Sequence, residues 1–181
     1  MHDLVIRALA PTDDVAALTA LLHRAYAGLG ARGLNYTAVD QSVATTSERV
    51  AAGKCFVAEQ ESRIVGSVVV RQPQDAAQPA PVDTTPWYRR PDVAILGQLG
   101  VEPSLAGRGI GSRLVACCEA WALEHGFHWL ALDTAKPAAA LQALYAKLGF
   151  VAVEEVQWAG KRYRSVIMAK AMVAEGARSA R

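Results

Sequence analysis

The chain has 181 residues, of which 52% are hydrophobic and 20% charged, and its formal net charge is +2. This length suits one domain with a sizeable core, and so small a charge does not favour binding to nucleic acid or to a membrane surface. No apolar stretch approaches the roughly 20 residues of a transmembrane helix, and no signal peptide is evident. Cys55, Cys117 and Cys118 fit neither a disulfide framework nor a metal site. We therefore expect a cytoplasmic protein with buried free thiols.

The first half of the chain predicts a strand, a long helix, a short helix and a β-hairpin. Thr12 is placed to cap the long helix, whose apolar residues recur at helical spacing until Gly28 and Gly30 end it. Two strands then follow each other across a tight turn at Glu61 and Ser62, which implies antiparallel pairing. The expected ranges are 4–7 for the first strand, 47–52 for the short helix, and 54–59 and 64–70 for the hairpin.

The second half predicts a parallel crossover and a closing hairpin. A strand over 93–101 leads through a glycine-rich loop into a helix ending near Gly126, and an apolar strand over 129–132 follows. A strand, a helix and a second strand over this length form a right-handed crossover between parallel neighbours. Pro137 can start a further helix. Its predicted inner face consists of Leu141, Leu144, Tyr145 and Leu148, and the last hairpin spans 150–158 and 163–168.

This order of elements predicts an α/β (α+β) fold. The expected sheet is mixed and mostly antiparallel, with about seven strands, one parallel crossover between the fourth and fifth strands, and helices on both faces. We expect one domain over residues 1–173 and a frayed tail over 174–181.

The loop 105–112 carries glycine at every second position, namely Gly107, Gly109 and Gly111. Glycine lets the backbone approach a ligand closely, and the helix that follows would direct unpaired N–H groups and its positive dipole end to the same place. This arrangement suits a phosphate or pyrophosphate. The spacing matches neither the dinucleotide motif G-x-G-x-x-G nor the P-loop. Two interpretations stay open: a different phosphate-bearing cofactor, or a tight loop without a ligand.

The loop resembles the pyrophosphate motif of the GNAT family of N-acetyltransferases, R/Q-x-x-G-x-G/A, and the order of elements is similar to that family's along nearly the whole chain. Ala106 stands where the motif has Arg or Gln, and Ala138 where an Asn is often found, so two cofactor contacts are missing. The resemblance implies acetyl-CoA as co-substrate. It assigns the pyrophosphate to Gly107, Arg108, Gly109, Ile110, Gly111 and Ser112, and the pantetheine arm to Leu99, Gly100 and Val101. Packing against a bulky neighbour is the alternative reason for Gly97 and Gly100.

A second resemblance to the family lies in Leu144-Tyr145, followed by Gly149-Phe150. Transfer of an acyl group from a thioester to an amine expels a thiolate, which a nearby phenol can protonate as general acid. The resemblance assigns this role to Tyr145. The alternative is a core tyrosine, because Tyr145 also lies four residues after Leu141 on the apolar face.

The general base is less well defined by the sequence. Relatives often place a carboxylate on the fourth strand, where this chain has Gln98, which cannot take a proton. We expect Asp133, with Thr134, to form the polar pair at the diverging strands, although a capping or turn role fits both equally well. The other candidates for the base are Glu102, Asp92 and a water chain ordered by Gln98 and Thr134.

Two segments are candidates for the acceptor side of the site. The long segment 72–92 contains Trp87 beside Tyr88, Arg89 and Arg90, and such a wall would suit an amine that carries an acid group or an aromatic ring. A solvated excursion or a contact in a homodimer explains this segment as well. Residues 34–37, with Tyr36, are the other candidate wall.

The leading hypothesis is an N-acetyltransferase that moves acetyl from acetyl-CoA to a primary amine of a small molecule or peptide, by direct attack in a ternary complex. The rival hypotheses are a non-catalytic CoA-binding sensor or interaction module, and an acyltransferase that uses another acyl-CoA.

Overall fold

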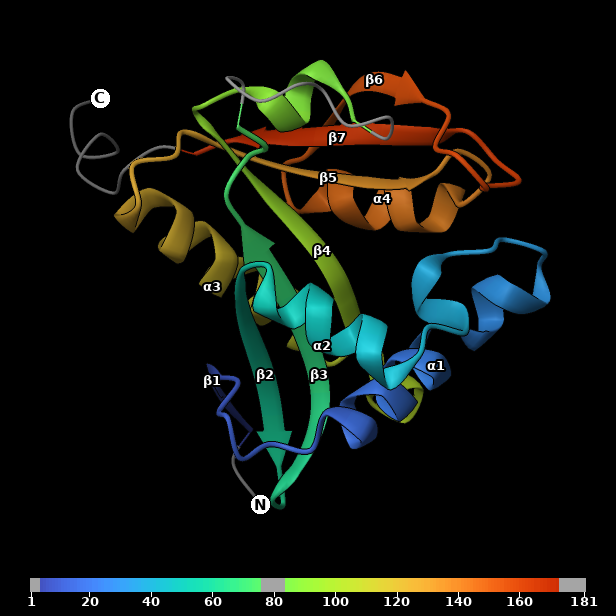
Figure 1. The fold of residues 1–181 in the computed structure, drawn as a ribbon, viewed down its shortest axis with the longest axis vertical. Helices are drawn as coiled ribbons and strands as arrows, with labels where there is room; N and C mark the ends of the chain where they lie inside the picture. The colour runs from blue at the N-terminus through green and yellow to red at the C-terminus, as the bar shows by residue number, and fades with distance from the viewer. Residues whose placement is uncertain (1–3, 76–83, 173–181) are drawn as a thin grey trace.

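The structure is a computed structural model, and it describes residues 4–75 and 84–172. The strands of this part form one seven-stranded sheet in the order β1-β2-β3-β4-β5-β7-β6 (Figure 1). Among these described strands, only β4 and β5 pair in parallel, which confirms the predicted crossover. The predicted tail over 174–181 and part of the 72–92 segment lie outside the described residues. The strands are β1 (Val5–Ala8), β2 (Lys54–Gln60), β3 (Arg63–Arg71), β4 (Val93–Val101), β5 (Trp129–Ala135), β6 (Val151–Val156) and β7 (Ser165–Ala171).

Helices cover both faces of the sheet, as predicted. A Cβ atom at Gly100 would lie 3.0 Å from the side chain of Leu22 on the first helix, whereas one at Gly66 would lie 3.1 Å from Leu114 on the third. Within the described residues, no helix combines the length and the apolar character needed to span a bilayer. The helices are α1 (Val15–Ala31), α2 (Val43–Ala51), α3 (Ile110–Glu124) and α4 (Ala139–Lys147), and short 3₁₀ turns span Thr37–Val39 (η1), Pro86–Arg89 (η2) and Pro103–Leu105 (η3).

The first helix differs from the prediction at both ends. Asp14, and not Thr12, is its N-cap, because the Asp14 carboxylate accepts hydrogen bonds from two N–H groups of the first turn. The helix also continues past Gly28 and Gly30 to Ala31. A Cβ atom at Gly30 would lie 2.8 Å from Val39, so this glycine permits close packing inside the helix and does not end it.

Two other local features were predicted with different success. Helix α2 begins at Val43, four residues before the predicted start, because Ser42 caps it by accepting a hydrogen bond from the Thr45 N–H group. The turn between β2 and β3 is confirmed at Glu61 and Ser62, whose φ angles are +51° and +58°. Positive φ at both central residues matches the twist of a two-residue hairpin.

The feature that positions the site is the divergence of β4 from β5. Their pairing stops at Ile95 and Ala131, and Figure 1 shows β4 running down the sheet while β5, β7 and β6 cross its upper end. On the other side, the pairing of β4 with β3 shifts register between Ser67 and Val69, and Gln98 at this bulge has a φ of +52°. A bulge leaves one residue unpaired and bends its strand. Backbone and side chains of β4 are therefore available on a wedge-shaped opening in the sheet.

Candidate functional site

The glycine loop forms a main-chain cradle at the start of α3. Gly107 and Gly109 both have a φ of +77°, and Gly109 caps the helix without any side-chain hydrogen bond. A Cβ atom at either position would meet nothing within 4 Å, so protein packing does not explain these glycines. Their positive φ angles explain them, because residues with a Cβ atom are strained in this conformation. The N–H groups of the first helical turn lack a capping side chain, as an anion site requires.

The side chains of the loop are divided between solvent and core. Gly107, Arg108, Gly109 and Ser112 are exposed, whereas Ile110 is buried in the main hydrophobic cluster. Ile110 could therefore offer a ligand its backbone N–H group but not its side chain. Arg108 lies at a separate surface hollow of about 420 Å³, next to the loop.

An apolar groove of about 190 Å³ leads away from this loop. It extends from Gly111 along β4, past Leu99, Gly100 and Val101, to Tyr145 on α4. Leu144 also lines it and is 45% exposed, so this leucine belongs to the groove and not to the inner core face predicted for it. Gly100 packs closely against α1, which was the alternative explanation for this glycine. A Cβ atom there would lie 3.0 Å from the Leu22 side chain.

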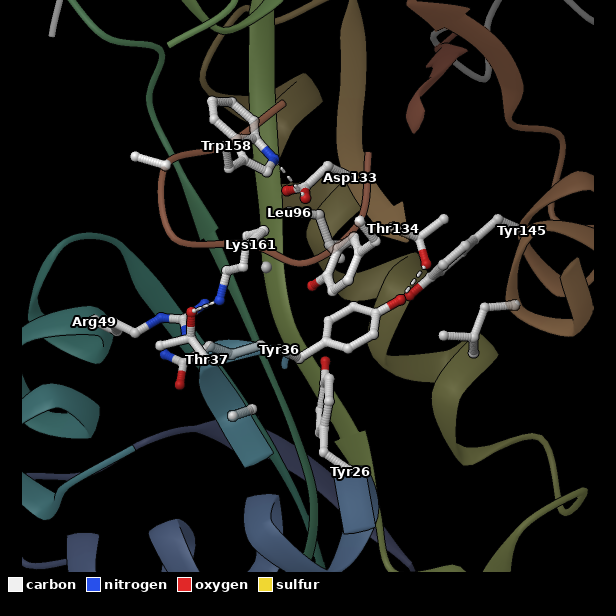
Figure 2. A pocket seen from close by; sticks show the side chains of 16 residues that line it. Tyr26, Tyr36, Thr37, Arg49, Leu96, Asp133, Thr134, Tyr145, Trp158 and Lys161 are labelled. Carbon is white, nitrogen blue, oxygen red and sulfur yellow. Dashed lines mark hydrogen bonds between the residues drawn. The ribbon is translucent and has the colours of Figure 1, made fainter. Parts of the chain in front are cut away.

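A larger cavity of about 410 Å³ opens where β4 and β5 diverge (Figure 2). Gln98 lines it from the β4 bulge, Asp133 and Thr134 from β5, and Tyr145 from α4. Tyr36 reaches it from the segment after α1, so the predicted residues of this set do come together. A Cβ atom at Gly97 would meet nothing within 4 Å, which leaves this glycine open to the cavity.

Two tyrosines hold the diverging strands apart. The Tyr26 hydroxyl donates to the Leu99 carbonyl of β4 over 2.9 Å, and the Tyr36 hydroxyl accepts from the Ala135 N–H group of β5 over 2.8 Å. The Tyr36 hydroxyl also shares a 2.9 Å hydrogen bond with the Thr134 hydroxyl. The rings of Tyr26 and Tyr36 meet edge to face, with centroids 5.5 Å apart. Each tyrosine thus satisfies a backbone group that the missing strand pairing leaves free.

Tyr145 stands where the groove meets the larger cavity, because it lines both. Its side chain is 7% exposed, and burial raises the pKa of its hydroxyl. The phenol therefore keeps its proton at neutral pH. Within the described residues its hydroxyl makes no hydrogen bond, and Figure 2 shows its ring directed into the cavity beside Tyr36 and Thr134.

Asp133 is the carboxylate that lines the cavity within the described residues. Its two oxygens accept hydrogen bonds from the Tyr88 hydroxyl and the Trp158 indole N–H, each over 3.0 Å. A carboxylate has about four acceptor positions, so these two donors orient it without exhausting it. The two alternative carboxylates do not line the cavity, and each forms a salt bridge, Glu102 with Arg24 and Asp92 with Arg90.

Trp87, predicted as a wall for the acceptor, does not line this cavity. It packs edge to face against Trp129, with Arg90 stacked 4.3 Å over its ring. Its neighbour Tyr88 turns inward instead and reaches Asp133, because adjacent residues of the short η2 turn point in different directions. The sequence analysis missed five aromatic or charged residues that line the cavity, and no local motif marks them: Tyr26, Arg49, Trp158, Lys161 and Tyr163.

The cysteines lie away from the site. Cys55 and Cys118 are buried, and neither they nor Cys117 line the groove or the larger cavity. Burial raises the pKa of the Cys55 thiol to about 12 and raises that of Cys118 as well. Such thiols stay protonated and are poor nucleophiles.

Comparison with known proteins agrees with this geometry. The model of the acetyltransferase (GNAT) family matches residues 16–150. The S-(2-succino)cysteine N-acetyltransferase of Bacillus subtilis (strain 168) is 26% identical over 166 residues, which cover 90% of this chain and 93% of that protein.

Solved structures share the fold at lower identity. The ribosomal-protein-S18-alanine N-acetyltransferase of Escherichia coli superposes with a TM-score of 0.68 at 20% identity, covering 96% of this chain and 97% of that one. A GNAT family acetyltransferase from Elizabethkingia anophelis, solved with acetyl-CoA bound, has a TM-score of 0.63 at 15% identity over 93% of this chain and 98% of that one. With the family model matched over most of its length, the chain belongs to the acetyltransferase (GNAT) family and is an acyltransferase.

Proposed function

We propose that this protein transfers the acetyl group of acetyl-CoA to the primary amine of a small acceptor, by direct attack in a ternary complex. The observation that carries the proposal is the continuity of the two cavities. Tyr26, Leu141 and Tyr145 line both the apolar groove and the larger polar cavity. A cofactor bound along the groove would therefore present its far end to the larger cavity at Tyr145.

The groove suits the successive parts of acetyl-CoA. The first turn of α3 offers N–H groups to the pyrophosphate, and Arg108 adds a positive charge from the loop itself. The apolar pantetheine arm would lie along Leu99, Gly100 and Val101, with Leu144 as the opposite wall. Beyond Ile95, β4 has no partner in β5, so its backbone can pair with the amide groups of the arm.

In the transfer step, the amine nitrogen attacks the thioester carbonyl carbon, and the bond between this carbon and sulfur breaks. The departing thiolate takes the proton of the Tyr145 hydroxyl, whose raised pKa keeps that proton available. Asp133 is the proposed acceptor of the proton that the attacking ammonium must lose, directly or through water near Thr134. A covalent enzyme intermediate is not required, and the protonated thiols of the cysteines argue against one.

The relative from Bacillus subtilis supports an amine acceptor, because S-(2-succino)cysteine carries a primary amine. We include S-(2-succino)cysteine in the acceptor screen for this reason. The screen follows CoA thiol release at fixed acetyl-CoA concentration. Turnover with any amine would exclude a non-catalytic sensor, and competition among acyl-CoAs of different lengths would identify the preferred acyl group.

The first test of the proposal is calorimetric titration with acetyl-CoA, in which an absence of binding at millimolar ligand would contradict it. Gly109→Asp should weaken binding at least about 100-fold, because it places a carboxylate beside the pyrophosphate. Gly126→Asp is the matched control. Gly126 lies just beyond the other end of α3, has a φ of +79°, and leaves similar free space around a Cβ atom. It should keep the affinity of the native protein.

A further inference from the structure

Three cationic side chains surround the larger cavity, and none has an ionic partner among residues 4–75 and 84–172. Arg49 and Lys161 line the cavity itself. Arg49 and Arg71 line a side pocket of about 90 Å³, which shares Gly97 and Gln98 with the cavity and is therefore a branch of it. Against these three cations, the described lining of the two cavities contains one carboxylate, that of Asp133.

The contacts that the structure describes for these cations are with neutral groups. Arg49 donates to the Gln41 side-chain oxygen over 2.9 Å, and Lys161 donates to the Asn35 carbonyl over 2.8 Å. Arg71 lies 5.7 Å over the Tyr88 ring. Within the part of the chain that the structure describes, none of the three forms a salt bridge. Burying a charge without an opposite charge is costly, and burial lowers the pKa of each.

A buried amide adds a neutral hydrogen-bond donor beside the arginines. Gln98 is 5% exposed, and its Nε2 atom has no hydrogen-bond partner within the described residues. The orientation of the Gln98 amide follows from Arg49 by way of Gln41. A guanidinium can only donate, so Arg49 requires the side-chain oxygen of Gln41. The Nε2 group of Gln41 then donates to the Gln98 oxygen over 2.9 Å. The Gln98 amino group is consequently left as a donor at the junction of cavity and side pocket.

We propose that the acceptor amine carries two carboxylates, one bound between Arg49 and Arg71 beside the Gln98 amino group, and the other bound by Lys161. This inference rests on the proposed function, since it identifies the class of amine that the transferase acetylates. Two carboxylates would match the surplus of two positive charges around the cavity. They would also give the three cations charged partners and supply an acceptor to the Gln98 amino group, which has none within the described residues. The acceptor is then a small acidic amino acid or a similar dicarboxylic amine.

The experiment compares pairs of acceptors that have the same shape and differ by one charge. The pairs are aspartate with asparagine, glutamate with glutamine, and S-carboxymethylcysteine with S-carbamoylmethylcysteine. We expect the acid of at least one pair to exceed its amide by roughly 10- to 100-fold in kcat/KM, as the loss of a charge-assisted hydrogen bond implies. Equal kcat/KM for acid and amide in every pair that reacts would overturn the inference while leaving the transferase function intact.

Variants test whether Arg49 and Lys161 bind the carboxylates of the acceptor. Arg49→Gln and Lys161→Gln should each raise KM for the acid with little change in KM for the amide, and Arg49→Lys should restore part of the preference. Lys147→Gln is the control, because it removes the same charge from an exposed position on α4 outside the cavity. A preference for the acid that survives both Arg49→Gln and Lys161→Gln would refute the assignment.

Direct binding separates this inference from the proposed function. Calorimetry with S-carboxymethylcysteine, in the presence of CoA, measures the acid site without any turnover. If acetyl-CoA binds but no amine is acetylated, the transferase function fails, whereas tight binding of the acid and its loss in Arg49→Gln would still support the anion site. If other amines react while dicarboxylic amines neither bind nor react, the anion site fails alone. Thermal unfolding of each variant confirms that it is folded.

Discussion

Replacing Tyr145 with Phe removes one oxygen atom from the junction of the groove and the larger cavity. That hydroxyl makes no hydrogen bond within the described residues, so its loss breaks no structural contact there, and the ring keeps its edge-to-face packing with Phe150 at 6.0 Å. The unfolding free energy should therefore change by less than about 0.5 kcal/mol. If the phenol protonates the departing thiolate, kcat should fall by roughly 10²–10⁴-fold, which corresponds to about 2.7–5.4 kcal/mol of transition-state stabilisation.

The assay follows CoA thiol release under saturating acetyl-CoA, together with calorimetric binding of acetyl-CoA and urea unfolding of the same preparation. Only the rate should change in Tyr145→Phe. An unchanged kcat would assign Tyr145 to the core and refute the proposed role. A fall in kcat accompanied by an equal loss of acetyl-CoA affinity would show instead that the hydroxyl contributes to cofactor binding and not to proton transfer.

Two further predictions concern stability. Tyr36→Phe leaves the Ala135 N–H group and the buried Thr134 hydroxyl without their partner, so urea unfolding should show a loss of about 2–4 kcal/mol; a loss below 0.5 kcal/mol would contradict the role assigned to this tyrosine. Arg7 donates to the Asp13 carboxylate over 2.7 Å, and this hydrogen bond holds the pKa of the Asp13 carboxyl below the usual 3.8. The charged pair therefore stabilises the fold above pH 3.8 and loses this effect as the pH falls. Asp13→Asn should cost about 1–2 kcal/mol at neutral pH, and a cost that persists near pH 2 would contradict this explanation.

Local patterns in the sequence were sufficient for most of the elements. The strand over 93–101, the hairpin turn at Glu61 and Ser62, and the parallel crossover are where the sequence predicts them. Local patterns were insufficient where a tertiary contact gives a residue a different structural role from the one that its neighbours in the sequence indicate. Gly30 resembles a helix end, yet it lies within α1 because Val39 packs against it.

The sequence alone predicted where the proposed cofactor cradle lies, because the φ angles and free N–H groups that an anion site requires depend on a few consecutive residues around Gly107 and Gly109. Which residues line the proposed acceptor cavity was determined by the tertiary structure. Arg49 and Lys161 belong to segments 112 residues apart, and neither segment carries a motif. They face one cavity only because β4 separates from β5 and the helices on each side close around the opening. A pattern of neighbouring residues cannot specify such a meeting, since it depends on the order and divergence of the strands.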